Sequence, residues 1–336
     1  MMVKAPRVGV LLLNFGGPET LDDVKPFLYH LFADPEVIRL PFIIREPLAR
    51  LMAAFRHKQS RGYYEKIGGG SPLRRITEQQ GAALKAALQQ QGYDIRIYIG
   101  MQCWRPFIQE AVRQIFNDRL THVIVLPLFP QFSVTTTRAC LVKFDKQVKK
   151  LPEWPIEQLV IEPWYDHPIY IQSLTEMIRE ELKKFSSEDV AKVHLLFSAH
   201  SIPQKYVDQG DPYAEQTRQT VELIMERLGR RNPYHLAFQS RLGPVRWLQP
   251  YTDKLIEELG REGVNHVLTI PISFVSEHIE TLYEIDMLYQ DIAREAGISN
   301  FRRVPAPNTY PTFIRALASL VQTKLAAFNL APASLT

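Results

Sequence analysis

The sequence lacks a cysteine framework, long apolar runs and a secretion signal. Its 336 residues include only 2 cysteines, and these form no CxxC pair. Such scarcity excludes a disulfide framework and favours a reducing, cytoplasmic location. No apolar run approaches the roughly 20 residues that a membrane-spanning helix needs, and the amino-terminal residues show no signal-peptide cleavage pattern. We therefore expect a soluble, cytoplasmic protein.

Strong charge and nucleotide fingerprints are also missing. The 40 basic residues are balanced by 36 acidic residues, and the net charge is only +4. Without a basic patch or a recognition motif, this balance gives no reason to expect nucleic acid as a partner. The glycine-rich runs NFGGP (14–18) and GGGSP (68–72) match neither the P-loop nor the dinucleotide motif. GGGSP is at most a permissive loop that offers backbone N–H groups to an anion.

The apolar residues predict the fold class. Short apolar runs alternate with amphipathic stretches, and the helical period is clearest in residues 74–90 and 169–185. Such alternation predicts βαβ units and an α/β fold with mostly parallel sheets that are covered by helices on both faces. The predicted strands are residues 8–14, 95–99, 122–128, 159–162, 193–198, 235–239 and 266–274.

The two halves of the chain resemble each other. THVIVLPLFPQFS (121–133) parallels NHVLTIPISFVSE (265–277), and IYIGMQCWRP (97–106) parallels LAFQSRLGPVRW (236–247) more weakly. We therefore predict two similar doubly wound, Rossmann-like domains that face one cleft. Prolines cluster between residues 151 and 168, which is typical of a boundary. The predicted domains are residues 1–160 and 161–311, and a helix within 312–336 packs back on the first domain.

One strand-like run leads directly to a histidine. VHLLFSAHSIP (193–203) delivers His200 to the carboxyl end of a predicted strand. Open α/β sheets bind their ligands at that edge. A lone histidine is nevertheless more often a satisfied core residue than a ligand. A second observation is therefore needed before His200 can be assigned to a site.

The second observation is a row of carboxylates after the strand predicted at 266–274. There the chain continues as SEHIETLYEID, in which Ser276 can cap a helix that carries Glu277, Glu280 and Glu284. Spacings of three and four place these carboxylates on one helical face. The alternative is an ordinary solvated face. An imidazole and a carboxylate row at two strand ends favour a divalent-metal site.

Residues 40–73 interrupt the alternation of strands and helices. Leu48, Leu51, Met52 and Phe55 recur at helical spacing among several basic residues. Two interpretations stay open: a helix whose apolar face packs in the core, or a basic amphipathic helix on a membrane surface.

Seven motifs together resemble a known family. In chain order they are LLLNFGGPETLDDV, IGGGSPL, LPLFPQFS, FSAHSIP, GDPYAEQ, FQSRLGPVRWLQPYTD and PISFVSEHIETLYEID. This order and spacing resemble the ferrochelatase family over about residues 8–320. The resemblance implies a two-domain chelatase that inserts ferrous iron into protoporphyrin IX to form protohaem, in the terminal step of haem biosynthesis.

The resemblance also implies roles for individual residues. His200 and Glu280 match the catalytic metal-site pair of the family, and a neighbouring path of acidic and imidazole groups is matched by Glu277, His278 and Glu284. The segment 48–55 matches an apolar lip that some members press against a membrane. The porphyrin-binding positions are matched by Phe15, Tyr64, Trp247 and Phe274. Arginines can bind the porphyrin propionates in a fork, and the candidates are Arg56, Arg241 and Arg246. For each of them the alternative of an ordinary surface arginine stays open.

The chemistry of metal insertion suits such a pair. Fe²⁺ must lose water, and two pyrrole protons must leave the porphyrin. A neutral imidazole and a carboxylate can bind iron and accept protons. We expect His200 to take a pyrrole proton and Glu280 to bind iron or relay the proton outward. The division of these roles between the two residues stays open.

The chain also departs from its relatives. Gln102 and Cys103 stand where some members have a basic residue followed by Tyr or His, and Phe15 occupies a variable position. These departures leave the choice between protoporphyrin and coproporphyrin open. Certain members hold a [2Fe–2S] cluster through several cysteines. Because two cysteines cannot supply four ligands, we expect no iron–sulfur cluster and no prosthetic group, with Fe²⁺ as a substrate.

Three alternatives to this function remain at this point. They are a coproporphyrin III ferrochelatase, a tetrapyrrole chelatase for another metal, and a non-catalytic tetrapyrrole or metal carrier. The expected partners are a porphyrin and ferrous iron. We expect a monomer, and peripheral contact with the inner face of the cytoplasmic membrane stays open.

Overall fold

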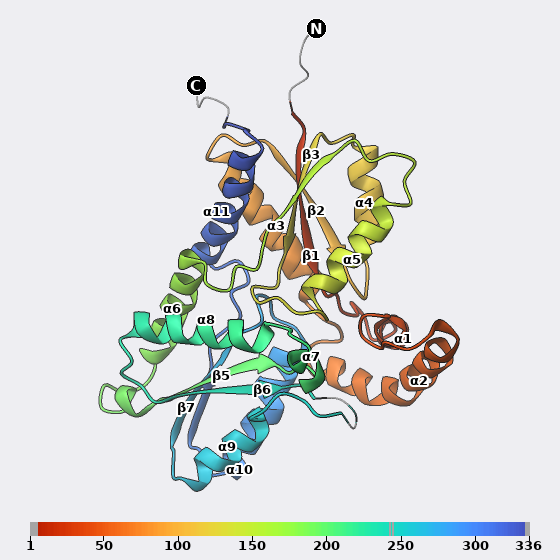
Figure 1. Ribbon diagram of the computed structural model, residues 1–336. Coiled ribbons are helices and arrows are strands. Elements are labelled where there is room, and N and C mark those ends of the chain that lie inside the picture. The colour runs from red at the N-terminus through yellow and green to blue at the C-terminus, as the bar shows by residue number, and fades with distance from the viewer. Residues whose placement is uncertain (1–5, 242, 244, 333–336) are drawn as a thin grey trace. The chain divides into compact units, whose positions relative to one another are not determined.

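Figure 1 shows the computed structural model of the chain, which describes residues 6–241, 243 and 245–332. The chain forms two compact units. Unit 1 comprises the described residues within Met1–Phe129, Val134–Trp164 and Phe313–Thr336, and unit 2 comprises Pro130–Ser133 and Tyr165–Thr312. The predicted division into folding domains at residues 160 and 311 stays a prediction.

Unit 1 contains a four-stranded parallel sheet with the strand order β2-β1-β3-β4. Every residue of the central strand β1 is buried, because both faces of the sheet are covered. The register pairs Leu12 with Ile99 on one side and with Leu126 on the other. The strands are β1 (Val8–Asn14), β2 (Ile95–Met101), β3 (His122–Pro127) and β4 (Glu157–Val160).

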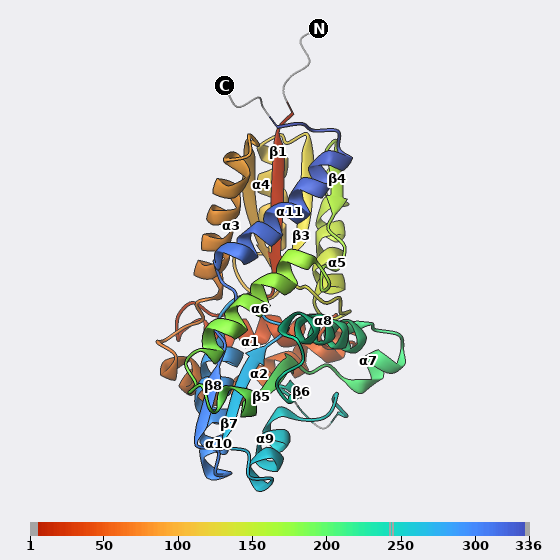
Figure 2. The same ribbon diagram turned by 90° about the vertical axis from the view of Figure 1, so that its left-hand side faces the viewer.

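Helices cover both faces of this sheet (Figures 1 and 2). Leu11 and Leu13 of β1 pack in one core cluster with residues of α4 and α5. The alternate residue Leu12 points to α3, where Gly81 allows close approach, since a Cβ there would lie 2.8 Å from Ile97. Helix α11 lies on the α3 side of the sheet in both views. These helices are α3 (Leu73–Gln89), α4 (Ile108–Asn117), α5 (Thr137–Val148) and α11 (Pro311–Ala327).

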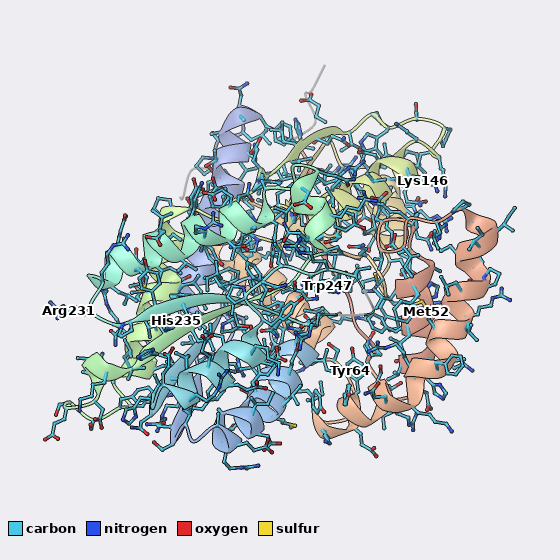
Figure 3. All side chains as sticks on the ribbon, turned by 60° about the horizontal axis from the view of Figure 1, so that its bottom comes forward. Met52, Tyr64, Lys146, Arg231, His235 and Trp247 are labelled. Atoms are coloured by element: carbon cyan, nitrogen blue, oxygen red, sulfur yellow. The ribbon has the colours of Figure 1, made fainter. Side chains whose placement is uncertain are left out.

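Two further helices of unit 1, α1 (Val24–Ala33) and α2 (Phe42–Lys66), pack against each other. The interpretation of segment 48–55 as core-facing is wrong for two of its apolar residues, because Leu51 is 54% exposed and Phe55 is 77% exposed. The buried positions of α2 are instead Ala49, Ala53 and Tyr64. Figure 3 labels Met52 and Tyr64 on this helix.

Apolar side chains thus remain exposed on α2, and we call them the α2 apolar surface. Spacings of seven and four place three of its members on one helical face. The members are Phe42, Ile43, Ile44, Leu51 and Phe55.

Unit 2 repeats the architecture of unit 1. Its four parallel strands have the order β6-β5-β7-β8, so β5, β6 and β7 occupy the places that β1, β2 and β3 hold in unit 1. The stronger sequence echo falls on β3 and β7, and the weaker echo falls on β2 and β6. The prediction of two similar α/β folds with parallel sheets is confirmed. The strands are β5 (His194–His200), β6 (Tyr234–Gln239), β7 (His266–Pro271) and β8 (Asn300–Arg303).

The helices of unit 2 also lie on both faces of their sheet. Leu196 of β5 and Val267 of β7 share a core cluster with Ile256 of α9 and Ala293 of α10. Helices α6 and α8 lie on the opposite face (Figure 1). Outside residues 280–289, the helices described in this unit are α6 (Pro168–Leu182), η1 (Val190–Lys192), α7 (Gln204–Asp208), α8 (Tyr213–Leu228), α9 (Thr252–Arg261) and α10 (Gln290–Glu295).

Three predictions about elements of unit 2 need correction. The strand predicted at 266–274 ends at Pro271, because the chain turns there toward the next segment. Strand β8 was not predicted from NFRR, which is too short and too polar to show an apolar run. The helix predicted to start at Ser276 is a π-helix, η2 (Glu280–Tyr289), with Ile279 at its N-cap, so Glu277 lies before the helix.

Candidate functional site

The register of the unit 2 sheet gathers three strand ends at one edge. His200 ends β5 and pairs with Gln239, which ends β6, while Ser198 pairs with Pro271 at the end of β7. The chain then passes from β7 through residues 272–279 into η2. The sequence therefore brings His200 and the SEHIETLYE segment to the carboxyl edge of one parallel sheet, as predicted.

The π-helix itself is unusual. A π-helix closes its hydrogen bonds over one more residue than an α-helix, and such wide turns are rare and concentrate at functional sites. Glu280 opens η2, and Glu284 follows one wide turn later. The side-chain amide of Gln239 donates a 3.0 Å hydrogen bond to the backbone carbonyl of Glu280. The end of β6 thus fixes the beginning of η2.

His200 and Glu280 are in direct contact. Nε2 of His200 lies 3.3 Å from Oε1 of Glu280, and both side chains are only about one-third exposed, at 36% and 27%. The backbone N–H of His200 donates to Oγ of Ser273 at 2.9 Å. Nδ1 of His200 lies 2.5 Å from the carbonyl oxygen of Ser201. The imidazole is therefore held from the strand side and presents Nε2 to the carboxylate.

A second imidazole completes this group. Nε2 of His278 lies 2.7 Å from Oε2 of Glu280, and its Nδ1 lies 3.0 Å from the carbonyl oxygen of Ser276. Both oxygens of Glu280 thus face an imidazole. Because carbonyl and carboxylate oxygens only accept hydrogen bonds, a ring nitrogen is the donor wherever one of these contacts is a hydrogen bond.

The pKa values of the pair follow from this arrangement. Burial alone lowers the pKa of His200, but the negative charge of Glu280 and its contact with the ring outweigh burial and raise the pKa above its ordinary value. Burial alone raises the pKa of Glu280, and the charges and hydrogen bonds of His200 and His278 reverse that effect and hold the pKa well below its ordinary value. At neutral pH the pair is therefore an imidazolium and a carboxylate.

Glu284 is anchored rather than free. Its carboxylate accepts hydrogen bonds from the backbone N–H of Ser240 at 3.0 Å, from Nε2 of Gln239 at 3.0 Å and from the hydroxyl of Tyr289 at 3.0 Å. The hydroxyl of Ser240 also donates to it. Burial and the neighbouring charge of Glu280 raise the pKa of Glu284. Ser240 adopts a left-handed conformation, with φ of 66°, which these contacts hold in place.

Glu277 is bound to an arginine. Its Oε1 accepts a 2.8 Å hydrogen bond from Arg303 of β8 and a 2.9 Å hydrogen bond from the backbone N–H of Ala306. Burial alone raises the pKa of Glu277, but the charge of Arg303 outweighs burial, and the pKa lies below its ordinary value. Glu277 therefore does not share a helical face with Glu280, because it precedes η2 and faces β8.

Two predicted aromatic residues also lie in unit 2. The ring of Phe274 packs edge-on against His278 with centroids 4.6 Å apart, and its centroid lies 6.5 Å from that of His200. Phe274 is therefore part of the group. Trp247, labelled in Figure 3, is half-buried and forms an isolated backbone bridge with Pro203, shortly after β5.

Three predicted porphyrin-binding residues belong to unit 1. Phe15 is half-buried directly after β1, and its carbonyl accepts a 2.8 Å hydrogen bond from the N–H of Cys103. Tyr64 is buried near the end of α2, and Arg56 is half-buried on the same helix. The triple glycine serves backbone packing at Gly70, where a Cβ would lie 2.0 Å from the carbonyl oxygen of Glu19.

Of the two arginines suggested for propionates in unit 2, Arg241 is already engaged. Its guanidinium lies 2.5 Å from Asp253 and stacks over the ring of Tyr251. Arg246 is exposed in the segment before Trp247. Arg246 is therefore the better placed of the two to meet an incoming carboxylate.

Four residues that build this site are not predicted from the sequence. Gln239, Ser240, Tyr289 and Arg303 each hold a carboxylate or a carbonyl of the segment 277–289. Gln239 and Ser240 lie in the quoted FQSRLGPVRW motif, so a signal was present for them. Neither Tyr289 nor Arg303 lies in a quoted motif.

Within the described part of the chain, no group of three or more His, Cys, Asp or Glu side chains is placed to hold a metal ion. His200 Nε2 and the Glu280 carboxylate offer a nitrogen and two oxygens, which are donors suited to first-row divalent metals. A two-residue set leaves most coordination positions to other ligands.

Solved chelatase structures share this fold. SirB, a sirohydrochlorin chelatase from Bacillus subtilis subspecies spizizenii in complex with cobalt, matches with a TM-score of 0.54 and 10% identity over 97% of this chain and 100% of that chain. SirB from Bacillus subtilis with Fe³⁺ gives a TM-score of 0.53 at 12% identity over the same shares. At these identities the likeness shows the fold alone, which is an α/β fold with two parallel sheets.

Sequence relatives show the family to which the chain belongs. The family model described as Ferrochelatase matches residues 7–325. A ferrochelatase of Nostoc punctiforme is 53% identical over 318 residues, which are 94% of this chain and 81% of that protein. One from Synechocystis is 52% identical over 322 residues, which are 95% and 83% of the two chains. The chain belongs to the ferrochelatase family. The predicted family is thus confirmed, together with the enzyme class, which inserts iron into a porphyrin in haem biosynthesis.

Proposed function

We propose that the protein inserts ferrous iron into protoporphyrin IX at the His200–Glu280 pair and so forms protohaem. The observation that carries this proposal is the 3.3 Å contact between His200 Nε2 and Glu280 at the carboxyl edge of the unit 2 sheet. Both groups can bind Fe²⁺, and both can take up protons. Metal insertion requires these two abilities in one place.

The reaction exchanges protons for the metal. Fe²⁺ enters the ring, two pyrrole N–H bonds break, and two protons leave. Because His200 Nε2 faces a carboxylate across a shared proton, that proton must leave before the imidazole accepts one from the ring. The double positive charge of arriving iron favours this loss, since metal and proton compete for the same lone pair. His200 is then the base, and Glu280 passes protons on.

His278 is the next proton acceptor in this scheme. It shares Glu280 with His200, at 2.7 Å from the second carboxylate oxygen. A proton taken by His200 reaches Glu280 and then His278 across separations of 3.3 Å and 2.7 Å. The predicted path through His278 and Glu284 stays a proposal, and Glu277 would join it only by exchanging its contact with Arg303.

The small ligand set agrees with iron as cargo. A protein that stores a metal surrounds it with a full set of ligands, whereas a donor must release the ion to four porphyrin nitrogens. His200 and Glu280 supply too few ligands to compete with the ring.

Aromatic and basic residues would form the porphyrin site. The ring of Phe274 lies 4.6 Å from that of His278 and 6.5 Å from that of His200, between centroids. A porphyrin needs broad apolar contact with a few polar groups for its propionates. We assign the apolar contacts to Phe15, Tyr64, Trp247 and Phe274, and the propionates to Arg56 and Arg246.

Location and assembly are further parts of the proposal. Among the described residues, no helix is both long and apolar enough to cross a membrane. The α2 apolar surface lies among basic residues and supports peripheral contact with the inner face of the cytoplasmic membrane. We propose a cytoplasmic monomer that reaches the membrane through this surface.

Anaerobic metal insertion tests the proposed function. Purified protein is mixed with Fe²⁺ and protoporphyrin IX, and haem formation is followed by absorbance, with Zn²⁺ as a surrogate metal. We expect turnover by the parent and near-complete loss in His200→Ala and Glu280→Gln, with porphyrin binding retained. Glu226→Gln is the matched control, because Glu226 is exposed on α8. Full activity in Glu280→Gln would remove Glu280 from the mechanism.

The same assay separates the alternatives. Faster turnover of coproporphyrin III than of protoporphyrin IX would identify a coproporphyrin ferrochelatase. Tight porphyrin binding without insertion of iron or zinc would identify a carrier and would overturn the proposal.

A further inference from the structure

The wide turn of η2 needs external support. A π-helix has poorer internal geometry than an α-helix and persists where surrounding contacts determine it. In this protein the segment must also hold Glu280 at one position, 3.3 Å from His200. The contacts that hold the segment are therefore part of the catalytic geometry.

Arg303 contacts this segment on both sides of Glu280. Its Nε donates to Oδ1 of Asp286 at 2.6 Å, and a terminal nitrogen donates to Oδ2 of Asp286 at 2.7 Å. The other terminal nitrogen donates to Oε1 of Glu277 at 2.8 Å. Glu277 precedes Glu280 by three residues, and Asp286 follows it by six. One guanidinium thus connects the approach to η2 with its second half.

The contact with Asp286 is bidentate and therefore directional. A planar guanidinium that meets a carboxylate with two parallel hydrogen bonds fixes the orientation of both groups, which an ammonium group cannot do. Arg303 is only 11% exposed, and Glu277 is 12% exposed. Because a buried charge that loses its partner is strongly unfavourable, the three side chains hold each other in one arrangement.

Strand β8 provides the rigid base for this contact. Arg303 is the last residue of β8 and pairs with Thr269 of β7. The preceding residue, Arg302, points to the other side and lies over the ring of Phe185 at 5.3 Å. Neighbouring arginines on one strand therefore have different surroundings, and only Arg303 contacts the acidic groups around η2.

We infer that Arg303 is a positioning residue that clamps Glu277 and Asp286 and thereby holds η2 in the register that presents Glu280 to His200. This inference rests on the proposed function of the pair. Arg303 does not touch the reacting atoms in this assignment. It acts on the distance between His200 and Glu280.

Three variants test the clamp. Arg303→Met removes the charge and the fork while retaining much of the apolar volume, and Arg303→Lys keeps the charge without the fork. Asp286→Asn weakens the clamp from the other side at a partly exposed position, so it keeps the test valid if Arg303→Met fails to fold. Arg302→Met is the matched control on the same strand.

The kinetic expectation is a loss in kcat without a loss of porphyrin affinity. A displacement of about 1 Å between reacting groups costs about a hundredfold in rate, so kcat for Zn²⁺ insertion should fall by about that factor in Arg303→Met. The kcat values of Arg303→Lys and Asp286→Asn should lie between those of Arg303→Met and the parent. The porphyrin KM of each variant should stay within about twofold of the parent value. Arg302→Met should match the parent. A purely structural role would lower the amount of folded protein and leave kcat per folded molecule unchanged.

Amide hydrogen exchange measures how firmly η2 is held, independently of catalysis. We expect the amides of residues 280–289 to exchange at least about tenfold faster in Arg303→Met and Asp286→Asn than in the parent, while Arg302→Met leaves them unchanged. A parent that inserts metal, together with Arg303 and Asp286 variants that keep both kcat and exchange rates, would overturn the clamp and leave the proposed function intact. A parent that inserts no metal would overturn the function, and the exchange rates would still decide whether Arg303 holds η2.

Discussion

The ammonium group of Lys143 lies 2.6 Å from a carboxylate oxygen of Asp34, whose side chain is completely buried. Lys143 comes from α5, and Asp34 is the C-cap residue of α1. The same ammonium donates to the carbonyl oxygen of Gln102 at 2.6 Å, and the Gln102 amide donates to Asp34 at 3.0 Å. One ion pair, with its carboxylate fully buried, therefore joins α1, α5 and the residue after β2 at the carboxyl edge of the unit 1 sheet.

Removing Lys143 should destabilise the protein strongly. In Lys143→Met the Asp34 carboxylate stays buried without its cation, which costs about 3 kcal/mol of unfolding free energy. Urea unfolding measures the difference. Lys146→Met is the control, because Lys146, labelled in Figure 3, is exposed on the same helix and should change stability by less than about 0.5 kcal/mol. Adding Asp34→Asn to Lys143→Met should recover part of the loss, and equal stabilities of both lysine variants would contradict the assignment.

Glu280 should control the protonation of His200. The carboxylate raises the pKa of His200 against the lowering effect of burial. In Glu280→Gln only burial and weaker contacts remain, so the pKa should fall toward or below the ordinary value of about 6.5. Histidine NMR titration measures it, with the His200 signal assigned by its absence in His200→Gln. Glu284→Gln should lower the same pKa by a smaller amount, and an unchanged pKa in Glu280→Gln would contradict a direct contact.

A histidine pair far from the proposed centre should make stability depend on pH. Nδ1 of His194 and Nε2 of His235 lie 3.0 Å apart at the beginning of β5 and β6, and Figure 3 labels His235. A hydrogen bond between two such nitrogens needs one of them unprotonated. Burial lowers the pKa of His194, and burial and the charge of His194 lower the pKa of His235, although Glu262 opposes both effects.

The sign of this dependence follows from the lowered values. The unfolded chain takes up protons below about pH 6.5, whereas the folded pair resists them, so stability is full above that pH and is lost as the pH falls below it. We expect the Tm difference between pH 8 and pH 5.5 to be larger in the parent than in His194→Asn/His235→Asn. Equal differences in the two proteins would show that the pair does not titrate with unfolding.

The strands of this fold could be predicted wherever they are buried on both faces. VGVLLLN and HLLFSAH are continuous apolar runs because helices cover both sides of each sheet. Strand β8 escaped prediction because an edge strand of four half-buried residues, NFRR, carries no such run. Helix α2 could be predicted as a helix, but the exposure of its apolar residues could not, since a helical period does not reveal which face is covered.

Part of the site could be predicted, because ligands of α/β proteins bind at the carboxyl ends of parallel strands. His200 and Glu280 follow from that rule and from the motifs, whereas the π-helix does not, because ETLYEIDMLY has a pattern that an α-helix would satisfy equally well. The residues that support the site also cannot be recognised from the neighbouring sequence. Arg303 lies 17 residues from Asp286 and 26 from Glu277, and only the fold brings the three together. Contacts of this kind depend on sheet topology rather than on sequence spacing.

The α2 apolar surface should bind anionic membranes. Ile43 is 83% exposed and Phe55 is 77% exposed, and basic residues such as Arg45, Arg50 and Lys58 lie along the same helix. Burying each large apolar side chain in lipid contributes about 1.5–3 kcal/mol, and each basic residue near an anionic surface contributes about 1 kcal/mol. Peripheral binding that weakens with salt is the expected result.

Co-sedimentation with vesicles that contain an anionic phospholipid measures this binding. Ile43→Asp/Phe55→Asp removes two apolar contacts and adds two negative charges, so partitioning should fall by at least about a hundredfold at about 1.4 kcal/mol per tenfold change. Val142→Asp is the control, because Val142 is an exposed apolar residue of α5 outside the α2 apolar surface. Sedimentation velocity of the same proteins without lipid decides the remaining possibility. If the parent is a dimer that the double variant dissociates, the surface joins two copies of the chain, and the membrane assignment is wrong.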